Sequence, residues 1–136
     1  ETYPKIRGYM DQCVADGRAH GYVETMYGRR RYTPELASKN YNVRSFGERA
    51  AMNAPIQGTA ADIIKAAMIH VHETLKKECP QAKLILQVHD ELIVDVPRDQ
   101  AEKVKKILTD CMQNVLPLDV PLIAEADSGE NWLEAK

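Results

Sequence analysis

The sequence predicts an α+β fold in which a small antiparallel sheet with a central hairpin packs against long helices. Two observations predict it. Residues 83–96 alternate with a period of two in two short runs, with a polar bend between them, which is typical of a hairpin. Residues 59–78 and 99–115 repeat apolar side chains at helical spacing, which predicts amphipathic helices. A chain of 136 residues is long enough for one domain and hardly more.

The N-terminal half is predicted to hold one helix, one short strand and a polar loop. Residues 4–16 form the helix, and Gly17 and Gly21 are expected to break it. Residues 22–25 form the strand, and the loop after it contains three consecutive arginines. The apolar stripe of the helix consists of Ile6, Tyr9, Met10 and Cys13.

The middle of the chain allows two helical interpretations. Residues 45–53 have helical composition and are followed by Pro55. Thr59 and Asp62 fit a capping box, which would start a separate helix there. A single kinked helix from 45 to 78 explains the pattern equally well, because a helix can accommodate proline as a bend. The apolar positions common to both are Ile64, Met68, Val71 and Leu75.

The C-terminal half completes the predicted sheet. Leu84, Leu86 and Val88 share one face of the first run, and Leu92, Val94 and Val96 share one face of the second. Residues 99–115 form the next helix, and residues 120–126 are expected to add a third strand. A polar tail ends the chain.

Composition and charge exclude several classes of protein. Hydrophobic residues make up 44% and charged residues 28%, which is an ordinary globular balance. The net charge of −2 conceals an asymmetry, because residues 1–65 carry +3 and residues 66–136 carry −5. The first half is therefore the part suited to a polyanion. No apolar run is long enough to cross a membrane and no secretory signal is present, so no membrane partner is expected.

The three cysteines, Cys13, Cys79 and Cys111, have no CxxC spacing. They are interpreted as reduced thiols of an intracellular, cytoplasmic protein rather than as a disulfide scaffold or zinc site. The absence of an initial methionine predicts that the sequence is part of a longer chain.

The bend His89-Asp90-Glu91 is the most informative local feature. Two adjacent carboxylates repel each other, and a divalent cation relieves that repulsion. Mg²⁺ prefers carboxylate oxygens together with phosphates and water, and paired ions catalyse phosphoryl transfer. The alternative is an ordinary solvated turn. Two residues cannot complete a two-metal site, so another carboxylate must come from elsewhere.

Arg49, Asn53 and Gln57 are spaced by four and four, and on a continuous helix they share one face. All three donate hydrogen bonds, which suits the minor groove of a duplex, where acceptors occupy similar positions at every base pair. A solvated helix face is the alternative. Gly58 beside them permits either close approach of a ligand or close packing.

The arginine triplet Arg29-Arg30-Arg31 is interleaved with tyrosines, and all six tyrosines of the chain precede residue 42. Phosphate contact and base stacking are natural uses of such a stretch. Arginines paired with Glu24 or Glu35 in a solvated loop are the competing interpretation. His70 and His72 are not expected to bind a metal, because positions two apart on a helix point to different sides.

Two segments together resemble the family A DNA polymerases, the family of bacterial DNA polymerase I: residues 53–62, with the sequence NAPIQGTAAD, and residues 87–91, with the sequence QVHDE. Residues 21–25, 28–32 and 129–132 fit the same family, so the resemblance covers essentially the whole chain. It implies the C-terminal segment of a polymerase domain, with a palm-type sheet. About 1–50 would be the end of the fingers and a basic loop, and about 51–136 the palm.

The resemblance also implies a chemistry and a set of site residues. The reaction would be template-directed addition of deoxynucleotides to a primer 3′-hydroxyl, a nucleotidyltransferase activity of DNA replication and repair that uses two Mg²⁺ ions. Asp90 would be a catalytic metal ligand, and Glu91 would support the site or contact the metal indirectly. The residues implied to contact primer–template DNA are Arg49, Asn53, Gln57, His89 near the primer terminus, and Arg31 near the template.

The family's other catalytic aspartate and the fingers helix that binds the deoxynucleoside triphosphate are not recognisable in these residues. The resemblance therefore implies that the 136 residues alone cannot polymerise, and that the missing segments lie elsewhere in a complete chain or in a second chain. Two rivals stay open: a non-catalytic DNA-binding module or subunit of a split polymerase, and a metal-dependent nuclease. The nuclease would need further ligands that this sequence does not supply.

Overall fold

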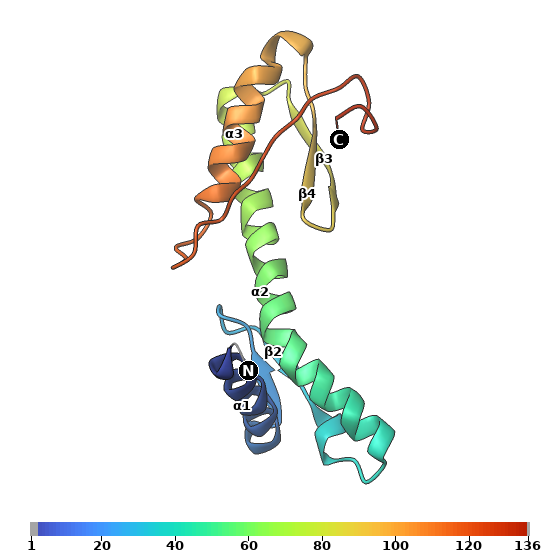
Figure 1. Cartoon of the computed structure of the whole chain (residues 1–136). Coiled ribbons are helices and arrows are strands. Elements are labelled where there is room, and N and C mark those ends of the chain that lie inside the picture. Colours follow the sequence, from blue (N-terminus) through green and yellow to red (C-terminus); the bar gives the residue numbers. More distant parts are fainter. Residues whose placement is uncertain (1–2, 136) are drawn as a thin grey trace. The chain divides into compact units, whose positions relative to one another are not determined.

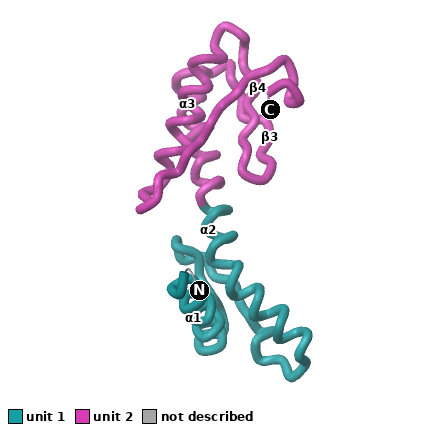
Figure 2. Tube along the Cα trace, viewed as in Figure 1, with its two compact units in different colours: residues 1–62 teal, residues 63–136 magenta. Residues whose placement is uncertain are grey.

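The computed structural model describes residues 3–135, which form two compact units divided within one helix, between Asp62 and Ile63 (Figure 2). That helix, α2, runs over Tyr41–Glu78 and contributes to both units (Figure 1). The chain combines helices with two separate two-stranded antiparallel sheets. The predicted α+β class is therefore confirmed. No helix among the described residues has the length and apolar character needed to cross a membrane.

The first unit packs a helix and a small hairpin against the first part of α2. Its core consists of Val23, Leu36 and Ala51, with Val14 and Ala54 beside them. The elements before α2 are α1 (Pro4–His20), β1 (Tyr22–Glu24), β2 (Arg30–Tyr32) and the 3₁₀ turn η1 (Pro34–Ala37).

Helix α1 is longer than the sequence predicted, because Gly17 does not break it. A Cβ at Gly17 would lie 2.8 Å from the Leu36 side chain, so this glycine allows close packing inside the unit. The helix ends at Gly21, whose φ of 78° gives the left-handed conformation typical of a glycine C-cap. The predicted break is therefore right at Gly21 and wrong at Gly17.

Strand β2 lies in the segment that was predicted to be a polar loop. Tyr22 pairs with Tyr32, and Glu24 pairs with Arg30. Two of the three residues of β2 are arginines, so its sequence carries little apolar pattern of its own. The pairing with β1 is what makes it a strand.

Helix α2 passes through Pro55 without interruption, which confirms the single-helix alternative, although the helix begins at Tyr41 rather than at residue 45. The predicted capping box is wrong, because Thr59 and Asp62 lie inside the helix. The Thr59 hydroxyl donates to the Pro55 carbonyl at 2.5 Å, as threonines inside helices commonly do.

The second unit packs the end of α2 and helix α3 (Ala101–Gln113) against the hairpin of β3 (Lys83–Val88) and β4 (Glu91–Asp95). The 3₁₀ turn η2 (Arg98–Gln100) precedes α3. Lys103 donates to the Glu78 carbonyl at 2.8 Å and so satisfies a free acceptor at the end of α2. The core is formed by Val71, Leu75, Cys79, Ala82, Val104 and Ile107.

The predicted third strand at residues 120–126 is not formed. This segment is extended but pairs with no strand among the described residues. Gln113 donates to the Ala124 carbonyl at 3.0 Å, and Val120 and Ile123 are largely exposed. A strand needs a hydrogen-bonded partner in a sheet, and the described residues offer none at this place.

Candidate functional site

The continuous path of α2 places Arg49, Asn53 and Gln57 on one exposed face of the first unit. Arg49 donates to the Ser45 hydroxyl one turn earlier at 3.0 Å. The amides of Asn53 and Gln57 have no hydrogen-bond partner within residues 3–135. These three residues, which we call the donor row, are therefore available to acceptors outside the described chain.

The opposite face of the same helix is buried. Gly47, Ala51, Pro55 and Thr59 also follow a spacing of four, but they are offset by two residues from the donor row, and all four are buried. The residues are small, which lets η1 and the β1–β2 hairpin approach closely; a Cβ at Gly47 would lie 2.8 Å from Glu35 Cβ. This buried stripe determines which face of α2 is exposed, and the sequence prediction overlooked it.

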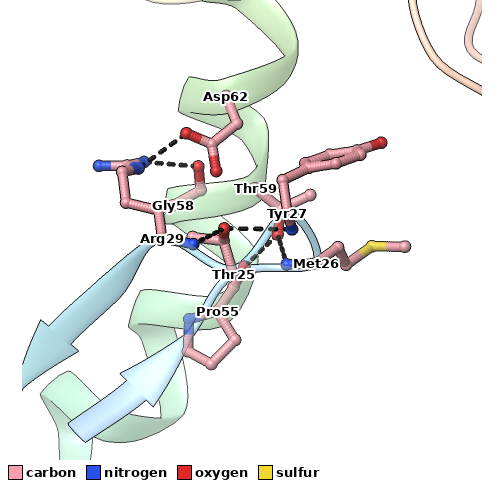
Figure 3. A network of polar contacts seen from close by, with 8 residues as sticks. All are labelled: Thr25, Met26, Tyr27, Arg29, Pro55, Gly58, Thr59 and Asp62. Carbon is pink, nitrogen blue, oxygen red and sulfur yellow. Dashed lines mark hydrogen bonds and ion pairs between the residues drawn. The ribbon is translucent and has the colours of Figure 1, made fainter.

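The turn between β1 and β2 is fastened to the buried side of α2 by a polar network (Figure 3). The Met26 amide donates to the Thr59 hydroxyl at 3.0 Å. Arg29 donates through Nε to Asp62 at 2.7 Å and through Nη2 to the Gly58 carbonyl at 2.7 Å. Gly58 has no room for a side chain, because its Cβ would lie 2.5 Å from Thr25 Cγ2. The sequence left the role of Gly58 open, and these contacts give it a packing role.

The three consecutive arginines have three different environments. Arg29 is held by α2, as described above. Arg30 donates to Glu24 at 2.7 Å and lies over the Tyr22 ring at 4.4 Å; the hydrogen bond to Glu24 is the main cause that raises the pKa of Arg30. Arg31 is exposed and has no ion-pair or hydrogen-bond partner within residues 3–135. Of the triplet, Arg31 is the one whose charge is left available to a phosphate.

The second candidate region is the turn that joins β3 and β4. Val88 pairs with Glu91, so the turn itself has two residues, His89 and Asp90, rather than the three expected, and Glu91 opens β4. His89 has a φ of 54°, a left-handed conformation that is uncommon outside glycine but typical of two-residue hairpin turns. Gln87 supports the turn by donating to the His89 carbonyl at 2.6 Å.

The two carboxylates at this turn are exposed to solvent. Neither Asp90 nor Glu91 has an ion-pair or hydrogen-bond partner among the described residues. Their oxygens fit the preference of Mg²⁺ for hard ligands, so the donor chemistry suits that ion. Residues 3–135 contain no group of three side chains from His, Cys, Asp and Glu that could hold a metal. The pair thus fits part of a magnesium site and needs ligands from another source.

The donor row and the turn lie in different units, and each is defined by its own contacts. Residues 1–134 match the family model described as DNA polymerase family A. The chain belongs to DNA polymerase family A. It is 49% identical to the thermostable DNA polymerase I of Thermus filiformis and 48% identical to DNA polymerase I of Bacillus subtilis, in each case over all 136 residues. It spans about 16% of the length of each of these relatives.

A solved polymerase structure is also similar. It is described as the POL domain of Pol1 from M. smegmatis in complex with DNA primer-template and dNTP. The TM-score is 0.90 and the sequence identity is 46%, over 95% of this chain and 23% of the other. The likeness therefore extends to the folded structure of the segment as well as to its sequence.

Proposed function

We propose that the chain is the C-terminal part of the polymerase domain of a DNA-directed DNA polymerase. About 1–50 would be the end of the fingers and a basic loop, and about 51–136 the palm. The reaction is nucleotidyl transfer to a primer 3′-hydroxyl. The observation that carries the proposal is the donor row. On an unbroken α2, three hydrogen-bond donors share one exposed face of a family A polymerase segment, and within residues 3–135 only Arg49 among them makes a side-chain hydrogen bond, to Ser45.

In this proposal the donor row holds the primer–template duplex through its minor groove. The minor groove presents acceptors at similar positions in every base pair, so such contacts tolerate any DNA sequence, as a polymerase requires. Arg31 contributes a phosphate contact, and His89 lies near the primer terminus. The similar M. smegmatis structure was solved with primer-template DNA and dNTP, which supports DNA and deoxynucleoside triphosphates as partners.

Asp90 is the proposed ligand of the catalytic Mg²⁺ ions, and Glu91 supports the site. Bound Mg²⁺ ions would activate the attacking hydroxyl and stabilise the leaving oxygen. The chain's own contribution is to hold Asp90 at a short turn, braced by the Gln87 hydrogen bond to the His89 carbonyl. Neither carboxylate has a partner within residues 3–135, which supports this role, because a ligand already paired inside the protein would have to break that pairing first.

The 136 residues by themselves are expected to be inactive, because two adjacent carboxylates do not complete a two-metal site. The test is primer extension by the purified 136-residue chain with Mg²⁺ and with Mn²⁺, beside a complete polymerase that contains it. Incorporation by the complete chain alone supports the proposal. Robust incorporation by the 136 residues would contradict it.

A second candidate function, a non-catalytic DNA-binding module or a subunit of a split polymerase, is favoured by the incomplete metal ligand set. Co-purification with a second chain that supplies the missing carboxylate would identify the split polymerase. DNA binding with no incorporation in any such combination would identify the binding module. Mg²⁺-dependent cleavage of DNA without nucleotides would instead point to a nuclease.

A further inference from the structure

The β1–β2 turn is a preformed element rather than a flexible loop. The Thr25 amide donates to the Arg29 carbonyl at 3.0 Å, and the Gly28 amide donates to the Thr25 carbonyl at 3.0 Å. The Thr25 hydroxyl also accepts from the Arg29 amide at 3.2 Å. Gly28, at a φ of 76°, supplies the left-handed residue that closes the turn. A turn held in this way can stabilise the part of α2 that it contacts.

The contact it makes is close to Pro55, which lies inside α2. Pro55 has no N–H, so the backbone hydrogen bond that would return to Ala51 is missing from the helix. One turn later, the Thr59 hydroxyl donates to the Pro55 carbonyl and accepts from the Met26 amide, so it joins the β1–β2 turn to the helix next to the proline. Arg29 adds its bonds to Asp62 and Gly58 immediately afterwards (Figure 3).

The network and the donor row occupy opposite sides of the helix. At 3.6 residues per turn, Pro55, Thr59 and Asp62 face roughly away from Asn53 and Gln57. The donor row spans the proline, with Asn53 before it and Gln57 after it. A change in the direction of the helix at Pro55 would therefore move the Asn53 and Gln57 amides out of line with each other, and they could no longer contact one groove together.

We propose that Arg29, Asp62 and Thr59 are positioning residues for duplex binding, which lock the β1–β2 turn onto the back of α2 and keep the donor row aligned across Pro55. This inference rests on the proposed DNA-binding role of the row. The Asp62 side chain is only 16% exposed, and one of its oxygens is buried without a partner, so the carboxylate depends on Arg29 for compensation. Removing either Arg29 or Asp62 breaks the same ion pair between the β1–β2 turn and α2.

The ion pair also separates this role from a direct phosphate contact. If Arg29 bound DNA directly, removing Asp62 would free its guanidinium and strengthen binding. If the pair positions the row, removing Asp62 weakens binding as much as removing Arg29. The opposite signs make Asp62→Ala the decisive variant.

The experiment measures primer–template dissociation constants of the complete polymerase and its variants over a range of salt concentrations. Arg29→Ala and Asp62→Ala should each weaken binding about tenfold, and the double variant should be no weaker than either single one. The dependence of affinity on salt should keep its slope, because no phosphate contact is lost. Arg30→Ala is the matched control, since Arg30 bonds Glu24 and lies over the Tyr22 ring within the hairpin, and it should bind as the unmodified protein does.

Thr59 supplies a milder second pair of variants. Thr59→Val keeps the shape of the side chain but removes the hydroxyl that accepts from the Met26 amide, so it should weaken primer–template binding. Thr59→Ser keeps the hydroxyl, so its affinity for primer–template should equal that of the unmodified protein. Hydrogen exchange of the amides of residues 51–59 should be faster in Arg29→Ala and Thr59→Val, with or without DNA. This readout tests the lock even if the unmodified polymerase fails to bind primer–template, a result that would overturn the proposed function instead.

Three results would overturn the positioning role. The first is tighter or unchanged binding by Asp62→Ala together with a salt slope lowered by about one in Arg29→Ala, which is the signature of a phosphate contact. The second is unchanged affinity of the folded fraction in all lock variants, with only their thermal stability reduced. The third is unchanged hydrogen exchange at residues 51–59.

Discussion

The donor row on α2 and the turn between β3 and β4 are built in contrasting ways. Arg49, Asn53 and Gln57 stand on a helix whose reverse face is buried and fastened by its own unit. Asp90 and Glu91 stand at an exposed turn and have no partner among the described residues. Under the proposed function, the described residues would form the DNA-binding face of α2 by themselves, whereas a magnesium site at the turn would need ligands beyond those that residues 3–135 place there.

The charges of the two regions follow the same division. The donor row presents hydrogen-bond donors and no negative charge, and it lies in the half of the chain with net charge +3. The turn presents two adjacent negative charges in the half with net charge −5. Such a turn attracts cations and repels a DNA backbone unless metal ions intervene. Substitutions in each region therefore test this division.

Asp90→Ala in the complete polymerase should lower the rate of nucleotide incorporation by about a thousandfold or more, because charge stabilisation by a metal is worth several kcal/mol. The primer–template dissociation constant should change less than about threefold, since no member of the donor row is touched. Single-turnover incorporation and duplex binding measured on the same preparation provide the check. Equal loss of rate and affinity would mean that Asp90 supports folding rather than metal binding.

Gly58→Ala should disturb the packing of the β1–β2 turn against the side of α2 that faces away from the donor row. Its Cβ would lie 2.5 Å from Thr25 Cγ2, so the β1–β2 turn must move, at a cost of about 1–3 kcal/mol. Thermal unfolding and duplex affinity should both decrease. Gly8→Ala is the matched control: Gly8 lies in α1, and apart from its chain neighbours and the nearby helix backbone no atom lies within 4 Å of its Cβ position, so alanine should leave stability unchanged or raise it by up to about 1 kcal/mol. Equal behaviour of the two variants would contradict the packing role of Gly58.

Gln57→Ala should weaken primer–template binding about fivefold through the loss of one hydrogen bond, while incorporation at saturating DNA is largely retained. The loss should be similar for duplexes of different sequence, because the minor-groove acceptors are alike. Gln12→Ala, which removes an exposed glutamine from α1, is the control and should have no effect. A marked preference for particular base pairs in Gln57→Ala would count against groove contact.

Arg31→Ala should give the smallest effect, a loss of about threefold in affinity at moderate salt. The slope of log affinity against log salt should decrease by about one, as expected for one lost phosphate contact. Arg30→Ala should leave the slope unchanged, because Glu24 already compensates that charge. If the two arginines behaved alike, the distinction between free and engaged members of the triplet would be wrong.

Local patterns predicted the second unit better than the first. The alternation around His89-Asp90-Glu91 predicted the hairpin, because both strands and their short connection are adjacent in the sequence. The strand expected at residues 120–126 is not formed, since that segment finds no partner strand within residues 3–135. Strand β2 was missed for the opposite reason: its arginines show no apolar pattern, and only pairing with Tyr22–Glu24 makes it a strand.

The middle of α2 could not be decided from the sequence, because Pro55 is compatible with either a break or a continuous helix. Contacts with residues about 30 positions away, from Met26 and Arg29 to Thr59 and Asp62, accompany the continuous form. The spacing of Arg49, Asn53 and Gln57 predicted a shared face only if the helix was continuous. That condition depended on tertiary contacts, which no local pattern reveals.

Binding of Mn²⁺, followed by electron paramagnetic resonance in the complete polymerase with primer–template and a non-reactive nucleotide, tests the central claim most directly. The unmodified protein and Asp90→Asn differ at the turn by one charged oxygen. We predict that Asp90→Asn loses at least about tenfold in Mn²⁺ affinity, because a neutral amide replaces a carboxylate ligand. Equal Mn²⁺ affinity in the two proteins would contradict the assignment of this turn as a metal-binding element.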